Sequence, residues 1–217
     1  MPRRTSANLK IRDEVAALKR ERTLDAAVDL FYDKGYENTT LDEVADRLGM
    51  TKPFVYANFG SKALLLAEIC QRGVQAPAQA LEAALARRKS PRDSLETFAR
   101  DYVNAVLGRQ KHIAIYVREE KNLDVADARR LGVMRREFFG KMTHLLEKGA
   151  ASGDFDIEDA HMAALGIGGA VTWATFWYRP DGRLAPPEIA QTMADLILGL
   201  AGARPRSGKA EARRKRA

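Results

Sequence analysis

The sequence predicts an all-α protein. Apolar residues recur at spacings of three and four along nearly the whole chain, which is the period of an amphipathic helix, and there is no sustained alternation typical of a strand. Prolines stand mostly at expected helix boundaries. With 217 residues, of which 46% are hydrophobic and 30% charged, the chain can form a substantial core and lacks the composition of a disordered protein.

The first predicted helix begins after Asn8 and ends at Gly35, where its apolar stripe stops and where glycine is a common terminator. A second, short helix is predicted over 41–48. Thr40 and Glu43 have the spacing of a capping box, in which each side chain bonds the backbone N–H of the other residue.

A third helix is predicted over 52–59, with Thr51 as its cap and Pro53 in its first turn, where proline is tolerated. A fourth is predicted over 61–74. Two short helices joined by a tight turn that contains glycine are typical of a helix-turn-helix, which here spans residues 40–59.

About five further helices are predicted after Pro77. The first of them begins near Pro91, and the others are expected over 111–122, 125–151, 157–178 and 187–201. Gly166, Gly168 and Gly169 lie within the fourth of these segments, and each glycine costs a helix about 1 kcal/mol relative to alanine. We therefore expect this helix to pack closely against a neighbour.

The two helices of the helix-turn-helix have distinct predicted faces. The inward residues are Val44, Ala45, Leu48, Val55 and Phe59, and the outward residues of the second helix are Lys52, Pro53, Phe54, Tyr56 and Asn58. In a helix-turn-helix this outward face enters the DNA major groove, where Phe54 can meet a thymine methyl, Lys52 a guanine and Asn58 an adenine edge or a phosphate. A helical hairpin buried in a core is the alternative that spacing alone leaves open.

Residues 23–69 contain the successive motifs LDAAVDLF, KGY, DEVADRLGMTK, VYANF and GSKALL. Together these resemble the DNA-binding domain of TetR-type transcriptional regulators. The resemblance implies a homodimer that binds a near-palindromic operator in double-stranded DNA. It also implies DNA contacts from Thr40, Thr51, Lys52, Pro53, Phe54, Tyr56, Asn58 and Lys62. Asn58 departs from the family, which usually has His or Tyr at that position.

The resemblance and the distribution of charge together predict the domain organisation. We expect a basic N-terminal arm over 1–16, a three-helix DNA-binding domain over 17–77, a helical ligand-binding and dimerisation domain over 78–202 and a disordered basic tail over 203–217. Residues 1–70 carry 11 basic and 11 acidic side chains, whereas the tail carries 7 and 1. A basic end attracts polyanions, but the tail can equally serve solubility. Arg3 and Arg4 could form an arm that reaches into the DNA minor groove. The alternative is that these residues are a frayed terminus.

Residues 177–200, together with YVREEKNL and LLEKGAASGDF in 111–155, resemble a TetR subgroup linked to fatty-acid and steroid catabolism, several members of which respond to acyl-CoA thioesters. This implies a small-molecule effector, with an acyl-CoA thioester as the candidate class. Its phosphates would need cations such as Arg118 and Arg179; an ordinary solvated face is the alternative for any one arginine. The candidate ligand contacts are Tyr116, Arg118, Phe138, Trp173, Trp177 and Tyr178. For Trp173 a core or dimer-interface role is the competing interpretation.

Enzymatic motifs are missing from the sequence. There is no glycine-rich phosphate loop, nucleophile elbow or paired His/Asp arrangement, and His112 with Glu119, two helical turns apart, is the nearest candidate. The lone Cys70 excludes an intramolecular disulfide and is expected to be a buried apolar residue. We therefore expect no enzyme, no cofactor, no metal and no membrane partner, and a cytoplasmic location.

The sequence thus predicts a ligand-responsive DNA-binding regulator that acts as a repressor and releases its operator when a small molecule binds. Two alternatives stay open. The same regulator class can sense an aromatic or cationic drug-like ligand, for which Asp101, Glu119 and Glu120 supply acidic groups. A protein of another class, a non-specific DNA-compacting protein, would rely on the basic tail.

Overall fold

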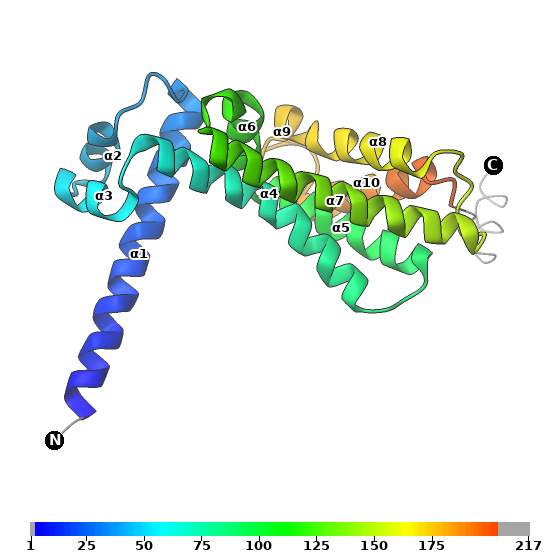
Figure 1. Ribbon diagram of the computed structural model, residues 1–217, viewed down its shortest axis with the longest axis horizontal. Helices are drawn as coiled ribbons and strands as arrows, with labels where there is room; N and C mark the ends of the chain where they lie inside the picture. Colours follow the sequence, from blue (N-terminus) through cyan, green and yellow to red (C-terminus); the bar gives the residue numbers. More distant parts are fainter. Residues whose placement is uncertain (1–2, 204–217) are drawn as a thin grey trace. The chain divides into compact units, whose positions relative to one another are not determined.

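The computed structural model describes residues 3–203, and the regular elements within them are helices (Figure 1). The predicted all-α fold is confirmed. The chain forms two compact units: Met1–Arg72 with Lys111–Arg129, and Gly73–Gln110 with Arg130–Ala217. The backbone therefore passes from one unit to the other three times, and Lys111–Arg129 belongs with the N-terminal residues.

The first unit consists largely of short helices around a long one. Its elements are α1 (Arg3–Lys34), α2 (Leu41–Leu48), α3 (Lys52–Phe59), the first part of α4 (Lys62–Ala86), most of α6 (Gln110–Glu119), the 3-10 turn η1 (Glu120–Asn122) and the start of α7 (Val125–Ala151). In Figure 1, α2 and α3 lie beside α1, whose N-terminal turns extend beyond them.

The predicted start of the first helix is wrong, because α1 begins at Arg3. No glycine or proline interrupts residues 3–34, and this stretch is rich in Ala, Leu, Lys, Arg and Glu, which are strong helix formers. Residues 3–16, predicted as an arm, accordingly lie in α1. The side chains of Arg3 and Arg4, and the tail from residue 204 onward, lie outside what the structure describes.

Local sequence signals at α2 act as predicted. The backbone N–H of Thr40 donates to Glu43 Oε2 at 2.8 Å, and the N–H of Glu43 donates to Thr40 Oγ1 at 3.2 Å, which completes the capping box. Gly49 ends the helix with φ +60°, a left-handed conformation suited to glycine. The predicted inward residues Val44, Ala45, Val55 and Phe59 are buried, whereas Leu48 is half-buried.

The second unit is a group of longer helices. It contains the end of α4, α5 (Pro91–Gly108), most of α7, α8 (Ala160–Thr172), α9 (Ala174–Trp177) and α10 (Pro186–Leu200). Figure 1 shows α5, α7, α8 and α10 running side by side. Fully buried side chains such as Leu95, Phe98, Met142 and Ile197 form the core between them.

Two predicted boundaries in this part of the chain are wrong. Helix α4 continues through Pro77 to Ala86. An interior proline removes one helical hydrogen bond, but burial of Leu81 and Ala84 one and two turns later holds the segment helical. The helix predicted over 157–178 instead begins at Ala160, because the Asp159 side chain caps it, and is interrupted at Trp173.

Close packing at the glycines of α8 is confirmed for one position. A Cβ on Gly168 would lie 2.6 Å from the ring of Phe139 on α7, so a larger residue cannot enter without displacing the ring. A Cβ on Gly166 or Gly169 would meet open space within the described chain. Of the three, only Gly168 is therefore required by packing inside the protomer.

Cys70 is fully buried, as predicted, and burial raises the pKa of its thiol to about 12. Across the described residues, none of the helices is both long and apolar enough to span a membrane.

Candidate DNA-binding surface and ligand pocket

Helices α2 and α3 form the predicted helix-turn-helix, joined through Gly49 and Thr51. Thr51 occupies the N-cap position of α3 in extended conformation, but its side chain makes no capping hydrogen bond. Its carbonyl oxygen instead accepts from the backbone N–H of Phe54 at 3.0 Å. The Thr51 hydroxyl therefore stays exposed beside the first turn of α3.

The outward face of α3 carries the predicted residues. Lys52 and Pro53 are exposed, and Tyr56 is 48% exposed, which is unusual for a large aromatic side chain. Phe54 is half-buried beneath the Lys19 ammonium, which lies 5.9 Å from the ring centroid. The Asn58 amide donates to the carbonyl of Phe54 at 2.8 Å, so part of its hydrogen-bonding capacity is used within α3.

Cationic side chains around this face are held by neighbours. The Lys52 ammonium donates to Asp42 Oδ2 at 2.6 Å. Lys62 Nζ lies 4.2 Å from the ring centroid of Tyr36 and donates to the carbonyl of Glu37 at 3.2 Å. Neither the ring nor the carbonyl carries a negative charge, so these two contacts do not form an ion pair with Lys62.

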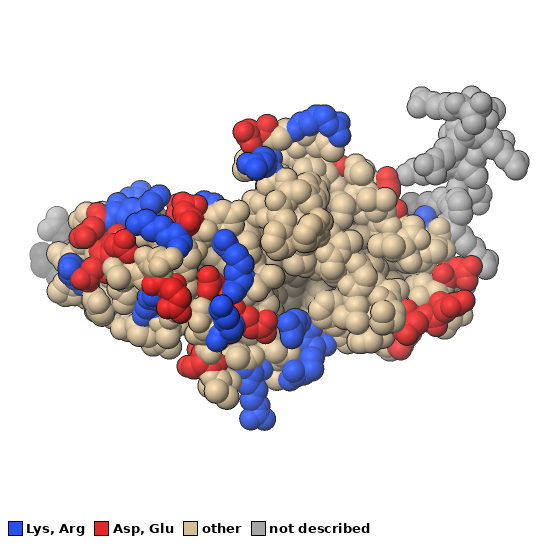
Figure 2. All heavy atoms as spheres, turned by 90° about the horizontal axis from the view of Figure 1, so that it is seen from above, with Lys and Arg blue, Asp and Glu red and all other residues tan. Residues whose placement is uncertain are grey.

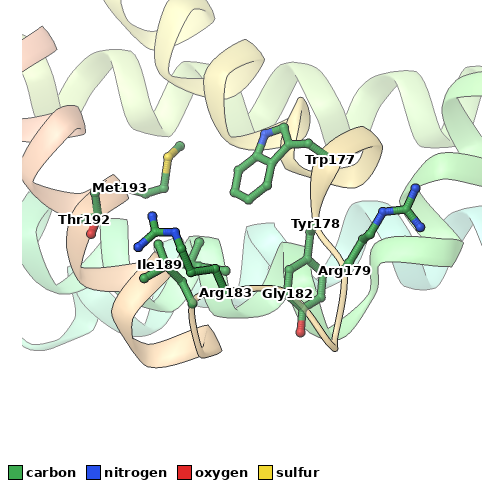
Figure 3. Close-up of a pocket in the computed structure, with 9 residues that line it drawn as sticks. Trp177, Tyr178, Arg179, Gly182, Arg183, Ile189, Thr192 and Met193 are labelled. Atoms are coloured by element: carbon green, nitrogen blue, oxygen red, sulfur yellow. The ribbon is translucent and has the colours of Figure 1, made fainter.

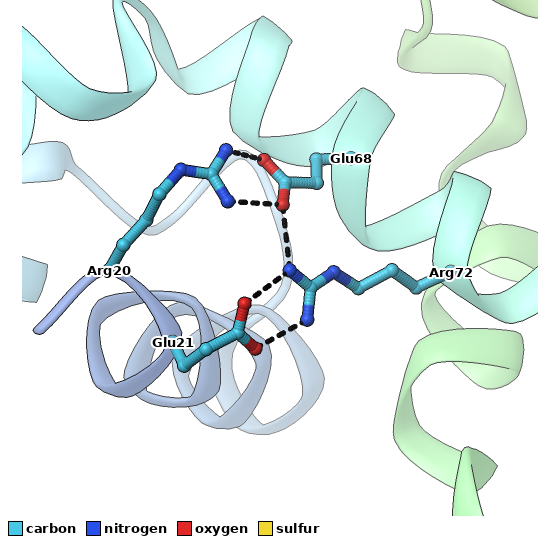
Figure 4. A network of polar contacts seen from close by, with 4 residues as sticks. All are labelled: Arg20, Glu21, Glu68 and Arg72. Carbon is cyan, nitrogen blue, oxygen red and sulfur yellow. Dashed lines mark hydrogen bonds and ion pairs between the residues drawn. The ribbon is translucent and has the colours of Figure 1, made fainter. Parts of the chain in front are cut away.

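A four-residue ion-pair network connects α1 to α4 (Figure 4). Glu68 receives a bidentate pair of hydrogen bonds from Arg20 and another from Arg72 at 3.0 Å, and Arg72 also bonds Glu21 at 2.6 and 2.7 Å. Burial raises the pKa of Glu68, but the two guanidinium groups outweigh it, so the net shift is downward. The Arg20 guanidinium also lies 4.8 Å from the ring of Phe59, and thereby links the end of α3 to the network.

Pairing of opposite charges is a general feature of this unit. Lys34 bonds Glu43 at 3.0 Å, in addition to the pairs already described. Figure 2 shows, on one face of the molecule, areas where basic and acidic side chains are mixed and a broad area without charged side chains. Because residues 1–70 carry no net charge, affinity for DNA cannot come from a general positive field here.

Polar contacts join helix α6 to α1 and to Tyr36, which lies just after the end of α1. Lys111 Nζ bonds Asp29 Oδ1 at 2.5 Å, the Arg118 guanidinium lies 4.8 Å from the ring of Tyr32, and Glu119 accepts a long hydrogen bond of 3.4 Å from the backbone N–H of Tyr36. Arg118, a candidate ligand contact, is thus engaged with α1. Tyr116, another candidate, is buried in the same unit, with its hydroxyl 3.2 Å from Glu120 Oε1.

A pocket of about 280 Å³ lies in the second unit where the α9–α10 loop meets α10 (Figure 3). Its lining residues are Trp177, Tyr178, Arg179, Gly182, Arg183, Leu184, Ile189, Thr192 and Met193. In Figure 3 the Arg183 guanidinium points toward Met193 and Thr192, whereas Arg179 points away. The Gln110 amide fixes the pocket wall by donating to the carbonyls of Thr175 and Tyr178 at 3.0 and 2.9 Å.

The pocket in Figure 3 contains two of the six predicted ligand residues, Trp177 and Tyr178. Phe138 belongs to an aromatic cluster with Phe98 and Tyr102 and lines a separate cavity of about 220 Å³ between α4 and α7. Trp173 is 61% exposed and lies against Phe176, with ring centroids 4.6 Å apart and the ring planes tilted by 33°. Trp173 is therefore not a core residue of the protomer.

Sequence reasoning missed several residues that the structure places in these sites. Arg183 lies in a loop without periodic pattern, so nothing local distinguished it from other surface arginines. Asp42 and Asp29 pair with residues ten or more positions away, which spacing rules do not reach. The i, i+4 spacing of Glu68 and Arg72 was the one signal available for the network in Figure 4.

A helix-turn-helix with an exposed basic and aromatic face, joined to a separate helical unit that contains a pocket, defines a ligand-responsive transcriptional regulator. Comparison with known families is consistent with that class. Residues 24–69 match the bacterial regulatory proteins of the tetR family, and residues 88–201 match the tetracyclin repressor-like C-terminal domain. The chain belongs to the TetR family, which is a class of transcriptional regulators and not of enzymes.

Similar proteins span nearly the full chain. The HTH-type transcriptional repressor KstR2 of Rhodococcus jostii is 28% identical over 187 residues, which cover 84% of this chain and 91% of that protein. A tetR-family regulatory protein from Rhodococcus RHA1 has a similar structure, with a TM-score of 0.78, 27% identity and coverage of 86% and 98%. AibR, solved with isovaleryl coenzyme A and operator DNA, shares the fold with a TM-score of 0.73 at 23% identity, over 85% and 99% of the two chains.

Proposed function

We propose that this protein is a homodimeric repressor that binds a near-palindromic operator through α3 and releases it when an acyl-CoA thioester binds. The observation that carries the DNA-binding part is the outward face of α3, where Lys52 and Tyr56 are exposed at the start of the second helix of a helix-turn-helix. That helix is the one that enters the major groove in such motifs. The hydroxyl of Thr51 and the ammonium of Lys62 flank it, in positions suited to phosphates.

Support for the homodimer comes from α8, α9 and α10. These helices expose a set of large apolar side chains: Met162, Leu165, Trp173, Phe176, Leu196 and Leu200. A monomer rarely exposes so many together. The open glycines Gly166 and Gly169 add room for close approach of a second helix, so a second copy of the chain would bury this face.

Support for an anionic acyl thioester comes from the pocket around Trp177. Its lining is mostly apolar, which suits an acyl chain. Of its two arginines, Arg183 directs its guanidinium toward Met193 and Thr192, whereas that of Arg179 points away. A pocket of about 280 Å³ holds an acyl group but not the whole of coenzyme A. The phosphates would then lie at the mouth, within reach of arginine. A cationic drug would meet Arg183 unfavourably, so the lining favours the anionic class.

The effector-binding unit and the DNA-binding unit are connected at the three points where the backbone passes from one to the other. Helices α4, α6 and α7 each have residues in both units or at their junction. A ligand that prefers one arrangement of the second unit can thereby bias the first, but only by its difference in affinity for the two arrangements. We propose that this bias changes the separation of the two recognition helices in the dimer.

The test is fluorescence anisotropy on DNA from immediately upstream of the protein's own gene, at ~150 mM salt with competitor DNA. Tight binding that one member of a panel of acyl-CoA thioesters releases is the expected result. Tight binding that no thioester releases would contradict the effector class and leave the regulator intact. Binding no tighter than that to competitor DNA would contradict the assignment of this upstream DNA as the operator. A selection from random duplexes would then test whether the protein recognises another sequence.

A further inference from the structure

The carboxylate of Asp42 lies beside the surface proposed to meet DNA and holds the first residue of α3. Lys52 Nζ and Asp42 Oδ2 are 2.6 Å apart, and the two side chains are 55% and 42% exposed. The hydrogen bond that Lys52 donates to Asp42 is the largest cause of a raised pKa of Lys52, and Asp46, one turn further along α2, acts in the same direction. The ammonium is therefore charged but paired.

The position of Asp42 is fixed by the rest of α2. The capping box of Thr40 and Glu43 sets the first turn, and Leu41 and Val44 on either side of Asp42 are buried. Lysine, by contrast, carries its charge on a flexible four-carbon stem. A free lysine at the start of α3 would reach phosphates as readily as base edges, whereas one held by a fixed carboxylate is restricted to a small volume.

We propose that Asp42 is a positioning residue that determines specificity. It holds the Lys52 ammonium at the N-terminal end of α3, where it faces base edges in the groove, and withholds it from phosphates. Lys52 then contributes to discrimination between sequences and little to general affinity. Lys62, which lies over the ring of Tyr36, retains the opposite role. The proposal rests on the proposed function of α3 as the recognition helix.

The experiment compares two DNA duplexes, one selected by the wild-type protein from a random library and one with the same bases shuffled. Affinities are measured by anisotropy across a salt series. For Asp42→Asn we expect binding to the shuffled duplex to strengthen by about two- to fivefold, the scale of an exposed ion pair. The slope of log K against log salt on that duplex should steepen by about 0.9, because one more phosphate is neutralised. Affinity for the selected duplex should fall, so the ratio of the two affinities decreases.

Three further variants separate pairing from net charge. Glu82→Gln removes an equal charge from the Glu82–Lys141 pair in the second unit and should leave the ratio unchanged. Asp42→Glu keeps a carboxylate and should stay close to the wild type. In a Lys52→Gln background, Asp42→Asn should have no further effect on the ratio.

Lys52→Gln alone provides a test that does not depend on the folding of the Asp42 variants. It should weaken binding to the selected duplex and leave the salt slope on the shuffled duplex unchanged. A slope that falls by about 0.9 would show that Lys52 contacts phosphates, and would overturn the proposal. An unchanged or increased ratio in Asp42→Asn would overturn it as well. A wild-type protein that selects no sequence overturns the recognition role of α3 itself, which is a different outcome from a protein that selects well and ignores Asp42.

Discussion

Lys62 differs from the other cations near α3 in what lies beneath its ammonium. An aromatic ring and a carbonyl oxygen hold it, whereas Lys52 and Lys34 are paired with carboxylates. A ring attracts a cation without cancelling its charge. At the scale of single residues, the unit therefore contains a charge available to phosphate and others that are already balanced.

Replacement of Lys62 by Gln should weaken binding on every DNA sequence by a similar factor, because a phosphate contact carries no sequence information. The slope of log K against log salt should become shallower by about 0.9. Anisotropy titrations on a selected and a shuffled duplex measure both quantities, and Lys141→Gln serves as the matched loss of charge. A loss confined to the selected duplex would show that Lys62 reads bases.

Replacement of Gly168 by Ala should destabilise the second unit by about 1–3 kcal/mol, the usual cost of overpacking, because its Cβ would lie 2.6 Å from the ring of Phe139. Gly140→Ala is the control, since a Cβ there meets open space and alanine favours helix by about 1 kcal/mol. Urea denaturation of both variants should give shifts of opposite sign. Equal stabilisation by both would contradict the close approach of α7 and α8.

Helices α1 and α4 are held together by side chains as well as by apolar packing. The network of Arg20, Glu21, Glu68 and Arg72 joins them, and Arg20 extends it to Phe59 at the end of α3. Helix α6 adds a second connection through Lys111 and Asp29. At the scale of elements, α3 is thus held by α1 through Arg20, and α1 is in turn held by α6 and by α4, the helix that continues into the second unit.

The network should make stability depend on pH. The pKa of Glu68 is lowered in the folded state, so its stabilisation is fully present above the unfolded value of about 4.3 and is lost as pH falls through the lowered folded pKa. Glu68→Gln should cost about 1 kcal/mol at pH 7, after allowance for solvent screening. Denaturation with urea at pH 7 and near pH 3 should show that difference shrink at the lower pH. If the stability difference between the wild type and Glu68→Gln is the same at both pH values, the charge of Glu68 does not stabilise the fold.

The whole molecule presents an apolar surface that a single chain does not cover. Trp173, between α8 and α9, is 61% exposed and Leu196 on α10 is 57% exposed, whereas their neighbours Ala174 and Ile197 are buried. A homodimer that buries this surface would also carry two copies of α3, and two half-sites one DNA turn apart require two such helices. Dimerisation and operator affinity should therefore change together.

Trp173→Glu combined with Leu196→Glu should convert the dimer into a monomer, because each places a charge in an apolar interface. Operator affinity should fall by roughly 10²-fold or more when the second half-site is lost. Sedimentation velocity measures the mass, and Val125→Glu, at a position 88% exposed in the first unit, is the control. A double variant that remains dimeric would place the interface elsewhere.

Much of the fold followed from the sequence because the deciding interactions are local. The capping box at Thr40, the left-handed Gly49 and the apolar period of residues 24–31 act within one or two helical turns, so spacing alone locates α2 and the end of α1. The same is true of the inward pair Val55 and Phe59. These signals, with the motif resemblance, were enough to identify the helix-turn-helix and its outward face.

Tertiary structure decided what depends on residues far apart in the chain. It carried α4 through Pro77, because burial of Leu81 outweighs one missing hydrogen bond. It placed Arg118 against Tyr32, since α6 packs on α1. It also paired Lys52 with Asp42. Charge pairs, pocket walls and helix continuation are set by which surfaces meet, and periodicity within one segment contains no record of the segment that it will face.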